Sequence, residues 1–268
     1  MPPDDQPTTF PVGLEFFDLH RKTAEQASET TEQMQRHSGI KLPATTEGLG
    51  TVLSIMYRAA CCGFGCNGGD HQLEWLVGRV VNQANAAFSL IRSASYDESL
   101  MLTRGIGEIT NLLWLFQNDS STKDAWRNAD RRERMNRFGP AAVRKALNQL
   151  GGIGPPVDDA RYQKLCEVGT HPVPGIAPSH FTGTGRPVLS GLVQPVGVYV
   201  ATTELSYAVA MCGTPTATIV IQDKEMRQSL FTASVTLIRS LGSFTVLNYE
   251  EKLAELQSKG QNEVSQLH

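Results

Sequence analysis

The helix-forming stretch 96–117 carries an arginine and a glutamate that could form a chemical centre. Arg104 and Glu108 are four residues apart, so on a helix they share a face. At about 100° per residue, Glu108 falls about 120° from the centre of the main apolar stripe, among further leucines. A carboxylate enclosed by leucines is costly unless it is paired, and Arg104 can supply the pairing. The pair is either a structural ion pair or a carboxylate–guanidinium centre that faces a cleft.

A histidine lies where the predicted helix 158–168 gives way to a Pro- and Gly-rich loop. This residue, His171, precedes Pro172. An imidazole at this place can act in acid–base chemistry or can cap the helix C-terminus. Cys166 is a weaker candidate, as a nucleophile, because the sequence shows no base beside it.

Metal-binding residue types crowd together just before the helix predicted over 70–93 and in its first turn. They are Cys61, Cys62, Cys66, Asp70, His71 and Glu74. His71 and Glu74 are three residues apart, and pairs of this kind bind metals in some helical bundles. The cysteine spacing differs from that of paired C-x-x-C zinc knuckles. The pattern fits either a metal site at His71 and Glu74 or a solvated histidine beside a glutamate that stabilises the helix dipole.

The glycines between residues 63 and 68 match the spacing G-x-G-x-x-G. In dinucleotide-binding folds these glycines follow a strand and admit a pyrophosphate to the start of a helix. Here the flanking segments are predicted helices, so we interpret the glycines as a loop that needs positive φ angles. No residue is therefore assigned to an organic cofactor, and the identity of any cofactor stays open.

Apolar periodicity predicts helices along most of the chain. The spacing of three and four residues is strongest in the segments 70–93 and 96–117, which we expect to form a central hairpin. The other predicted helices are 13–37, 46–60, 122–138, 141–150, 158–168, 190–211, 222–241 and 246–258. Two β-branched or apolar runs, 216–221 and 244–247, are candidates for short strands.

These elements predict an all-α fold, an antiparallel helical bundle with a long Pro/Gly-rich loop over 169–187. We expect a disordered arm over 1–12, a single helical domain over 13–258 and a frayed tail over 259–268. The chain has 268 residues, of which 40% are hydrophobic and 19% are charged. This composition excludes a disordered protein and suffices for a sizeable core.

Charge and hydropathy restrict the class of function. The net charge of −3 gives no general support to nucleic-acid binding, although a local basic patch is compatible with it. The first residues lack the basic start and apolar centre of a signal peptide. Gln194, Pro195 and Glu204 interrupt the most apolar stretch, 188–212, so we expect a buried helix and no membrane span. A cytoplasmic protein with reduced cysteines is the prediction.

Two motifs resemble those of a group of bacterial all-helical proteins, over roughly residues 60–211. The first is a leucine–arginine–glutamate helix that includes Arg104 and Glu108, and the second is a Tyr–x–x–Leu…His–Pro segment from Tyr162 to Pro172. The segment from Gly65 to Glu74 is similar to that group as well. Such proteins are compared with the HEPN superfamily, which includes ribonuclease toxins of bacterial defence.

The ribonuclease members of that superfamily carry an arginine four to six residues before a histidine. None of the six histidines in this chain has an arginine at that distance. The resemblance thus implies a HEPN-like helical protein that lacks this ribonuclease motif. It implies binding or processing of a nucleotide or RNA, in a bacterial defence or stress setting. In such a protein we expect Arg104 to hold a phosphate, Glu108 to orient it and His171 to transfer a proton.

Two alternative functions stay open beside this one. The first is a non-enzymatic interaction module or homodimer, which would use the charged helix around 131–137 or the C-terminal helix. The C-terminal helix places Val246, Tyr249, Leu253 and Leu256 at heptad spacing. The second is a metal-dependent hydrolase that uses His71 and Glu74. The sequence leaves open whether the protein is an enzyme.

Overall fold

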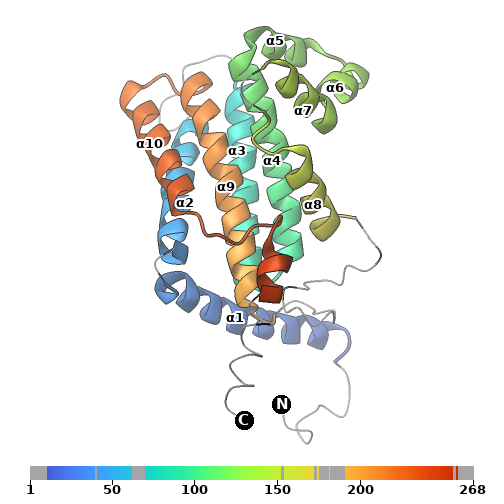
Figure 1. The fold of residues 1–268 in the computed structure, drawn as a ribbon, viewed down its shortest axis with the longest axis vertical. Coiled ribbons are helices and arrows are strands. Elements are labelled where there is room, and N and C mark those ends of the chain that lie inside the picture. The colour runs from blue at the N-terminus through green and yellow to red at the C-terminus, as the bar shows by residue number, and fades with distance from the viewer. Residues whose placement is uncertain are drawn as a thin grey trace, which may run out of the picture.

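The computed structural model describes residues 11–39, 41–61, 70–151, 154–171, 174, 181, 191–255 and 258. Within these ranges every regular element is a helix, and the helices pack against one another as an all-α bundle (Figure 1). This confirms the predicted fold class. No described helix combines the length and apolarity that a bilayer span requires. The predicted division into arm, domain and tail stays a prediction, because 1–10 and 259–268 lie outside the described residues.

Five long helices form the body of the bundle. They are α2 (Lys41–Ala60), α3 (Gln72–Arg92), α4 (Tyr96–Asn118), α9 (Pro195–Ile219) and α10 (Lys224–Ser240). Helix α9 packs against the other four and has buried residues all around its circumference. A helix that is apolar on every side belongs in the middle of a protein. Helices α3 and α4 are joined by three residues and pack together, as the predicted hairpin requires.

The remaining helices cover the ends and one side of this body. Helix α1 (Leu14–His37) crosses one end, and three short helices gather at the other end (Figure 1). The short helices are α5 (Ser120–Asn128), α6 (Arg131–Phe138) and α7 (Pro140–Gln149). Helix α8 (Asp159–Gly169) lies along α4. Residues 249–255 add a short helical segment near the end of the chain.

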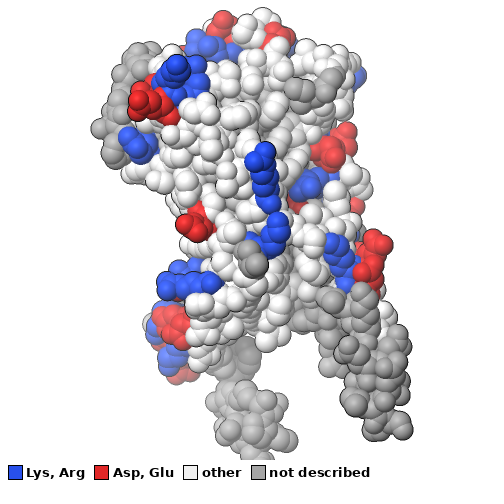
Figure 2. Space-filling model, turned by 60° about the vertical axis from the view of Figure 1, so that its left-hand side comes forward, with Lys and Arg blue, Asp and Glu red and all other residues white. Residues whose placement is uncertain are grey.

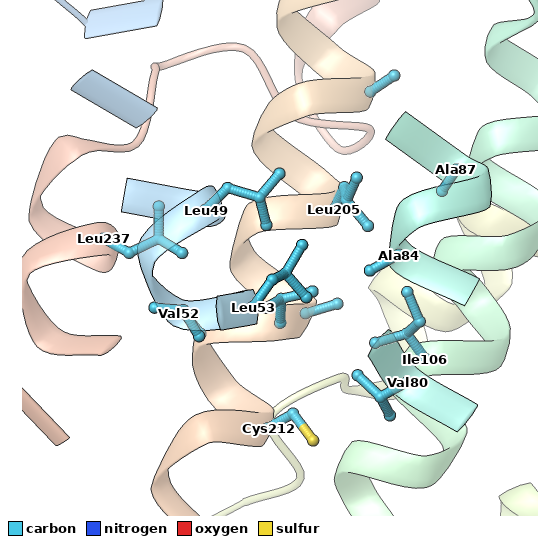
Figure 3. Packing of buried hydrophobic residues seen from close by; sticks show 14 of the residues in the cluster. Leu49, Val52, Leu53, Val80, Ala84, Ala87, Ile106, Leu205, Cys212 and Leu237 are labelled. Carbon is cyan, nitrogen blue, oxygen red and sulfur yellow. The ribbon is translucent and has the colours of Figure 1, made fainter. Parts of the chain in front are cut away.

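One apolar core joins the five long helices. Leu49 from α2, Val80 from α3, Ile106 from α4, Leu205 from α9 and Leu237 from α10 are all buried in it. Figure 3 shows these side chains meeting around α9. Burial of each such side chain stabilises the fold by about 1.5–3 kcal/mol. The core therefore fixes the positions of α4 and α9, against which α8 packs.

The prediction of one continuous helix over 122–138 was wrong, because the structure has two helices there, α5 and α6. The break falls at Ala129, and the side chain of Asp130 accepts a hydrogen bond from the Glu133 N–H at 2.7 Å. A capped aspartate of this kind starts a new helix. The second helix of the chain begins at Lys41, earlier than predicted, because Pro43 falls in the first turn, where its missing N–H is not needed.

The candidate strands were also wrong. Residues 216–219 belong to α9, which continues through Pro215, and residues 244–247 have no regular structure. Pro215 leaves the Met211 carbonyl oxygen without its helical partner. The indole Nε1 of Trp114 on α4 donates a hydrogen bond to that oxygen at 2.8 Å. Packing between α4 and α9 thus satisfies the group that the proline frees, and the helix continues.

Candidate functional site

Helices α4 and α8 bring four reactive side chains together, which we call the Arg104 centre. Arg104 and Glu108 come from α4, and Tyr162 and Cys166 come from α8. The Tyr162 hydroxyl donates a hydrogen bond to Glu108 Oε1 at 2.9 Å, and Arg104 Nη1 donates to Cys166 Sγ at 3.6 Å. The nearest atoms of the Arg104–Glu108 pair, Nη2 and Oε1, are 3.8 Å apart. The predicted pair exists, but the carboxylate makes its hydrogen bond with a tyrosine.

The Arg104 centre is half-buried. The side chains of Arg104 and Glu108 are 24% and 31% exposed, so they lie neither in the sealed core nor on the open surface. Both helices contribute two residues one turn apart, and this spacing keeps the four side chains on the shared face. A molecule in solvent can therefore reach charges that are partly shielded from water, where electrostatic interactions are stronger than in bulk water.

Burial and neighbouring charges shift two of these groups. Burial, the hydrogen bond to Glu108 and the charge of that carboxylate raise the pKa of Tyr162 to about 12. The pKa of Arg104 is also raised, because the Cys166 hydrogen bond and the charge of Glu108 outweigh burial, which alone would lower it. At neutral pH, Tyr162 is therefore a hydrogen-bond donor and Arg104 is a cation.

A second arginine packs on Tyr162. The guanidinium carbon of Arg144, from α7, lies 4.0 Å from the centroid of the Tyr162 ring, and that of Arg104 lies 5.7 Å from it. Arg144 is buried and its Nε donates to Asp159 Oδ1 at 2.5 Å. Among the described residues, neither Arg144 Nη1 nor Arg104 Nε has a hydrogen-bond partner, although both atoms are buried. Both guanidinium groups thus keep unused donors.

His171 contacts the Arg104 centre through its main chain. Its main-chain N–H donates to the Cys166 carbonyl oxygen at 2.8 Å and closes the end of α8, while its side chain is exposed. Within the part of the chain that the structure describes, no hydrogen bond or ion pair joins its imidazole to Arg104 or Glu108. The structure brings together two of the three predicted residues, and proton transfer by His171 stays a prediction.

The proposed metal ligands are close but incomplete. His71 Nδ1 and Glu74 Oε1 are 3.9 Å apart, and Asp70 forms an ion pair with Arg127 at 2.7 Å. In the described ranges, no three His, Cys, Asp or Glu side chains gather as metal ligands would. The glycine motif and the other two cysteines, Cys62 and Cys66, lie outside the described residues. The metal site therefore stays a prediction.

Sequence analysis missed an ionic contact beside the centre in which the carboxylate is fully buried. The carboxylate of Glu204 on α9 is 1% exposed and accepts hydrogen bonds from Arg161 Nη1 at 2.6 Å and from the Val246 N–H at 3.0 Å. Burial raises the pKa of Glu204, against the effects of Arg161 and the Val246 N–H. A signal existed, since Glu204 is the one charged residue between Arg186 and Asp223 in the sequence.

The two surfaces expected to bind a partner differ in accessibility. Arg131, Arg132 and Arg134 on α6 are exposed. Val246 and Tyr249, by contrast, are buried against the bundle, so half of the heptad stripe already packs within the chain. Leu256 lies outside the described residues.

Two grooves flank α2, away from the Arg104 centre. The groove between α2 and α3 has a volume of about 410 Å³, and Leu49, Leu53 and Phe88 are among its lining residues. The groove between α2 and α10 has a volume of about 640 Å³. Neither is lined by residues of α4 or α8.

A comparison with known proteins gives no further guide to the function. No protein-family model matches the chain, and no curated protein or solved structure is significantly similar to it.

Proposed function

We propose that the Arg104 centre binds the phosphate of a nucleotide or of RNA, in a HEPN-like helical protein of the bacterial cytoplasm. One observation carries the proposal. Arg104 is a half-buried cation whose hydrogen bond goes to a thiol, a weak acceptor, while the nearby carboxylate of Glu108 is engaged by Tyr162. A guanidinium gains far more from the charge-assisted hydrogen bonds of a phosphate.

A basic segment of the chain packs against α4. Residues 119–150, which include α5, α6 and α7, hold eight Lys and Arg against four Asp and Glu, whereas the whole chain has a net charge of −3. This end of the molecule is therefore basic although the protein is acidic. Helix α7 from this region places Arg144 on the same tyrosine ring that Arg104 faces. Arg144 thus adds a second cation next to Arg104, which favours an anionic ligand.

Each residue has a distinct role in this proposal. Arg104 binds two phosphate oxygens with its planar fork of donors. The Tyr162 hydroxyl donates its one proton to Glu108, which keeps that carboxylate from competing with the phosphate for Arg104. Proton transfer by His171 is a separate part of the proposal, since its imidazole does not contact the centre.

Calorimetric titration of the full chain with AMP, ATP and a short single-stranded RNA tests the proposal. We expect the wild type to bind at least one probe. Arg104→Ala should weaken binding by about 10- to 100-fold, because it removes charge-assisted hydrogen bonds. Arg104→Lys keeps the charge but lacks the fork of donors, so its affinity should lie between those of the wild type and Arg104→Ala. The control Arg21→Ala, in exposed ion pairs on α1, should bind like the wild type.

Circular dichroism of the same variants separates a binding role from a structural one. If Arg104→Ala loses its helical content, Tyr162→Phe provides a second test: it keeps the ring but frees the Glu108 carboxylate to pair with Arg104, which should weaken phosphate binding. The proposal is wrong if the wild type binds none of the three probes, or if folded Tyr162→Phe and Arg104→Lys both bind as the wild type does.

The location of the protein belongs to the same proposal. Cys61, Cys166 and Cys212 are free thiols. Free thiols are typical of a reducing compartment such as the bacterial cytoplasm. The HEPN-like relationship itself has its support in the sequence motifs around Arg104 and Tyr162.

A further inference from the structure

The outer face of α2 and α10 carries no charge over most of its length. Residues 48–57 of α2 and 228–238 of α10 contain no Asp, Glu, Lys or Arg. Yet much of this face is accessible, because Thr51 and Thr236 are exposed and Phe231 is 46% exposed. Figure 2 turns this side of the molecule forward, and uncharged residues cover most of it. Depletion of charge on an accessible surface is typical of the centre of a protein–protein interface.

This face combines a groove with a ridge. The groove between the two helices has a volume of about 640 Å³ and is lined mainly by small and hydroxyl-bearing residues, which include Gly48, Thr51, Ser229, Thr232, Ala233 and Thr236. Phe231 and Ile238, at two turns' separation on α10, form an exposed apolar ridge beside it. The buried residues Leu230, Ser234 and Leu237 face the bundle. Ridge and groove therefore lie on the two flanks of the exposed side of α10.

Charges of opposite sign lie at the two ends of this uncharged strip. Glu225 is in the first turn of α10 and Arg239 in its last turn. The two residues are about 40° apart around the helix and about 21 Å apart along it, so they flank one face. Neither forms an ion pair with another residue in the described ranges. The Lys41 ammonium, 3.2 Å from the Arg239 carbonyl oxygen, adds a second cation at that end.

We propose that this α2–α10 face binds a second copy of the chain, with the two α10 helices antiparallel across a two-fold axis. Such an axis places Glu225 of each copy beside Arg239 of the partner subunit, twice per dimer. The same axis sets the apolar ridges of the two copies against each other, with Phe231 of each copy near Ile238 of the partner subunit. A face that holds both halves of each complementary pair fits itself, which favours a second copy over an unrelated partner. The proposal is independent of the Arg104 centre, which lies on α4 and α8.

Sedimentation velocity of the full chain over a range of concentrations tests the dimer. We expect a monomer–dimer equilibrium in the wild type. Thr232→Arg should raise the dimer dissociation constant by about tenfold or more, because it buries a charge at the centre of the face. The control Thr30→Arg makes the same change at an exposed site on α1 and should leave the constant unchanged. A wild type that stays monomeric at every concentration overturns the proposal.

Charge reversal tests the antiparallel arrangement. Glu225→Arg and Arg239→Glu should each weaken the dimer by about tenfold, because each creates two like-charge contacts. The double variant restores opposite charges at both contacts and should recover most of the wild-type affinity. Thermal melting at low concentration shows whether each variant is folded. A dimer that none of these substitutions weakens, or a double variant as weak as the single ones, contradicts the proposed interface.

Discussion

Glu204 positions α8, although it lies outside the Arg104 centre. Its carboxylate holds Arg161, whose guanidinium carbon also lies 4.1 Å from the centroid of the Tyr207 ring. The next residue on α8, Tyr162, faces α4 and donates to Glu108. The ionic contact therefore holds α8 against α9 on one side while the Arg104 centre forms on the other. A buried carboxylate of this kind contributes more to the position of a helix than to net stability.

The stability of the protein should depend on the protonation of Glu204. Burial raises its pKa above the ordinary 4.5, so the folded chain binds this proton more tightly than the unfolded chain does. The stabilisation from that proton is fully present below pH 4.5 and is lost as the pH rises through the folded pKa. In urea unfolding, the free energy of unfolding of the wild type relative to Glu204→Gln should therefore fall as the pH rises from 4.5.

The control for this measurement is Glu29→Gln on the exposed side of α1. The difference in free energy of unfolding between this control and the wild type should not fall in the same way above pH 4.5. A second variant, Glu204→Ala, should cost about 3–5 kcal/mol at neutral pH, because it leaves Arg161 without its partner. If the difference in free energy of unfolding between the wild type and Glu204→Gln does not change with pH, the protonation of Glu204 does not control stability and the prediction is wrong.

At the scale of single residues, the sequence predicts local pairs better than distant ones. The pairing of Arg104 with Glu108 follows from their spacing on one helix. The contact of Glu108 with Tyr162 does not follow, because it depends on how α8 is aligned along α4. His171 was expected nearby, but the structure places its side chain in solvent at the end of α8. Alignment between helices arises from packing of the whole bundle, which no short pattern encodes.

At the scale of helices, strong apolar periodicity predicted helices correctly, whereas helix boundaries and short β-branched segments were predicted less well. The segments 70–93 and 96–117 have apolar stripes that only a helix can bury, and both are helices. The boundary at Asp130 was missed because a cap acts through one side chain within an otherwise continuous charged segment. The strand expected over 216–221 was wrong because β-branched residues accept a helical conformation where packing on neighbouring helices favours it.

Two helical glycines should respond in opposite ways to the same substitution. A Cβ at Gly213 on α9 would collide with the Ser234 hydroxyl on α10, whereas a Cβ at Gly50 on α2 would meet no atom within 4 Å. Gly213→Ala should therefore destabilise the protein by about 1–3 kcal/mol through overpacking. Gly50→Ala should stabilise it by up to about 1 kcal/mol, because alanine favours the helix. Thermal unfolding of both variants checks this, and equal shifts in Tm would contradict the close approach of α9 and α10.

At the scale of the whole molecule, the end of the described chain closes the bundle. Val246 and Tyr249 are almost fully buried, and the Tyr249 ring lies 5.1 Å from that of Phe181, which packs in turn against Tyr96. Lys164 on α8 forms an ion pair with Glu250 at 2.9 Å. The all-α class follows from periodicity alone, but this closure joins residues far apart in the sequence and is visible only in the folded chain.

Truncation after Leu241 should therefore unfold the protein more easily. It removes two buried side chains, each worth about 1.5–3 kcal/mol, and it takes the Val246 N–H away from the carboxylate of Glu204. We expect the free energy of unfolding in urea to fall by at least about 3 kcal/mol. Truncation after Glu255 keeps all of these contacts and serves as the control. If the shorter chain instead kept its stability and lost only self-association, the C-terminal segment would be the dimer contact, and the α2–α10 face would not.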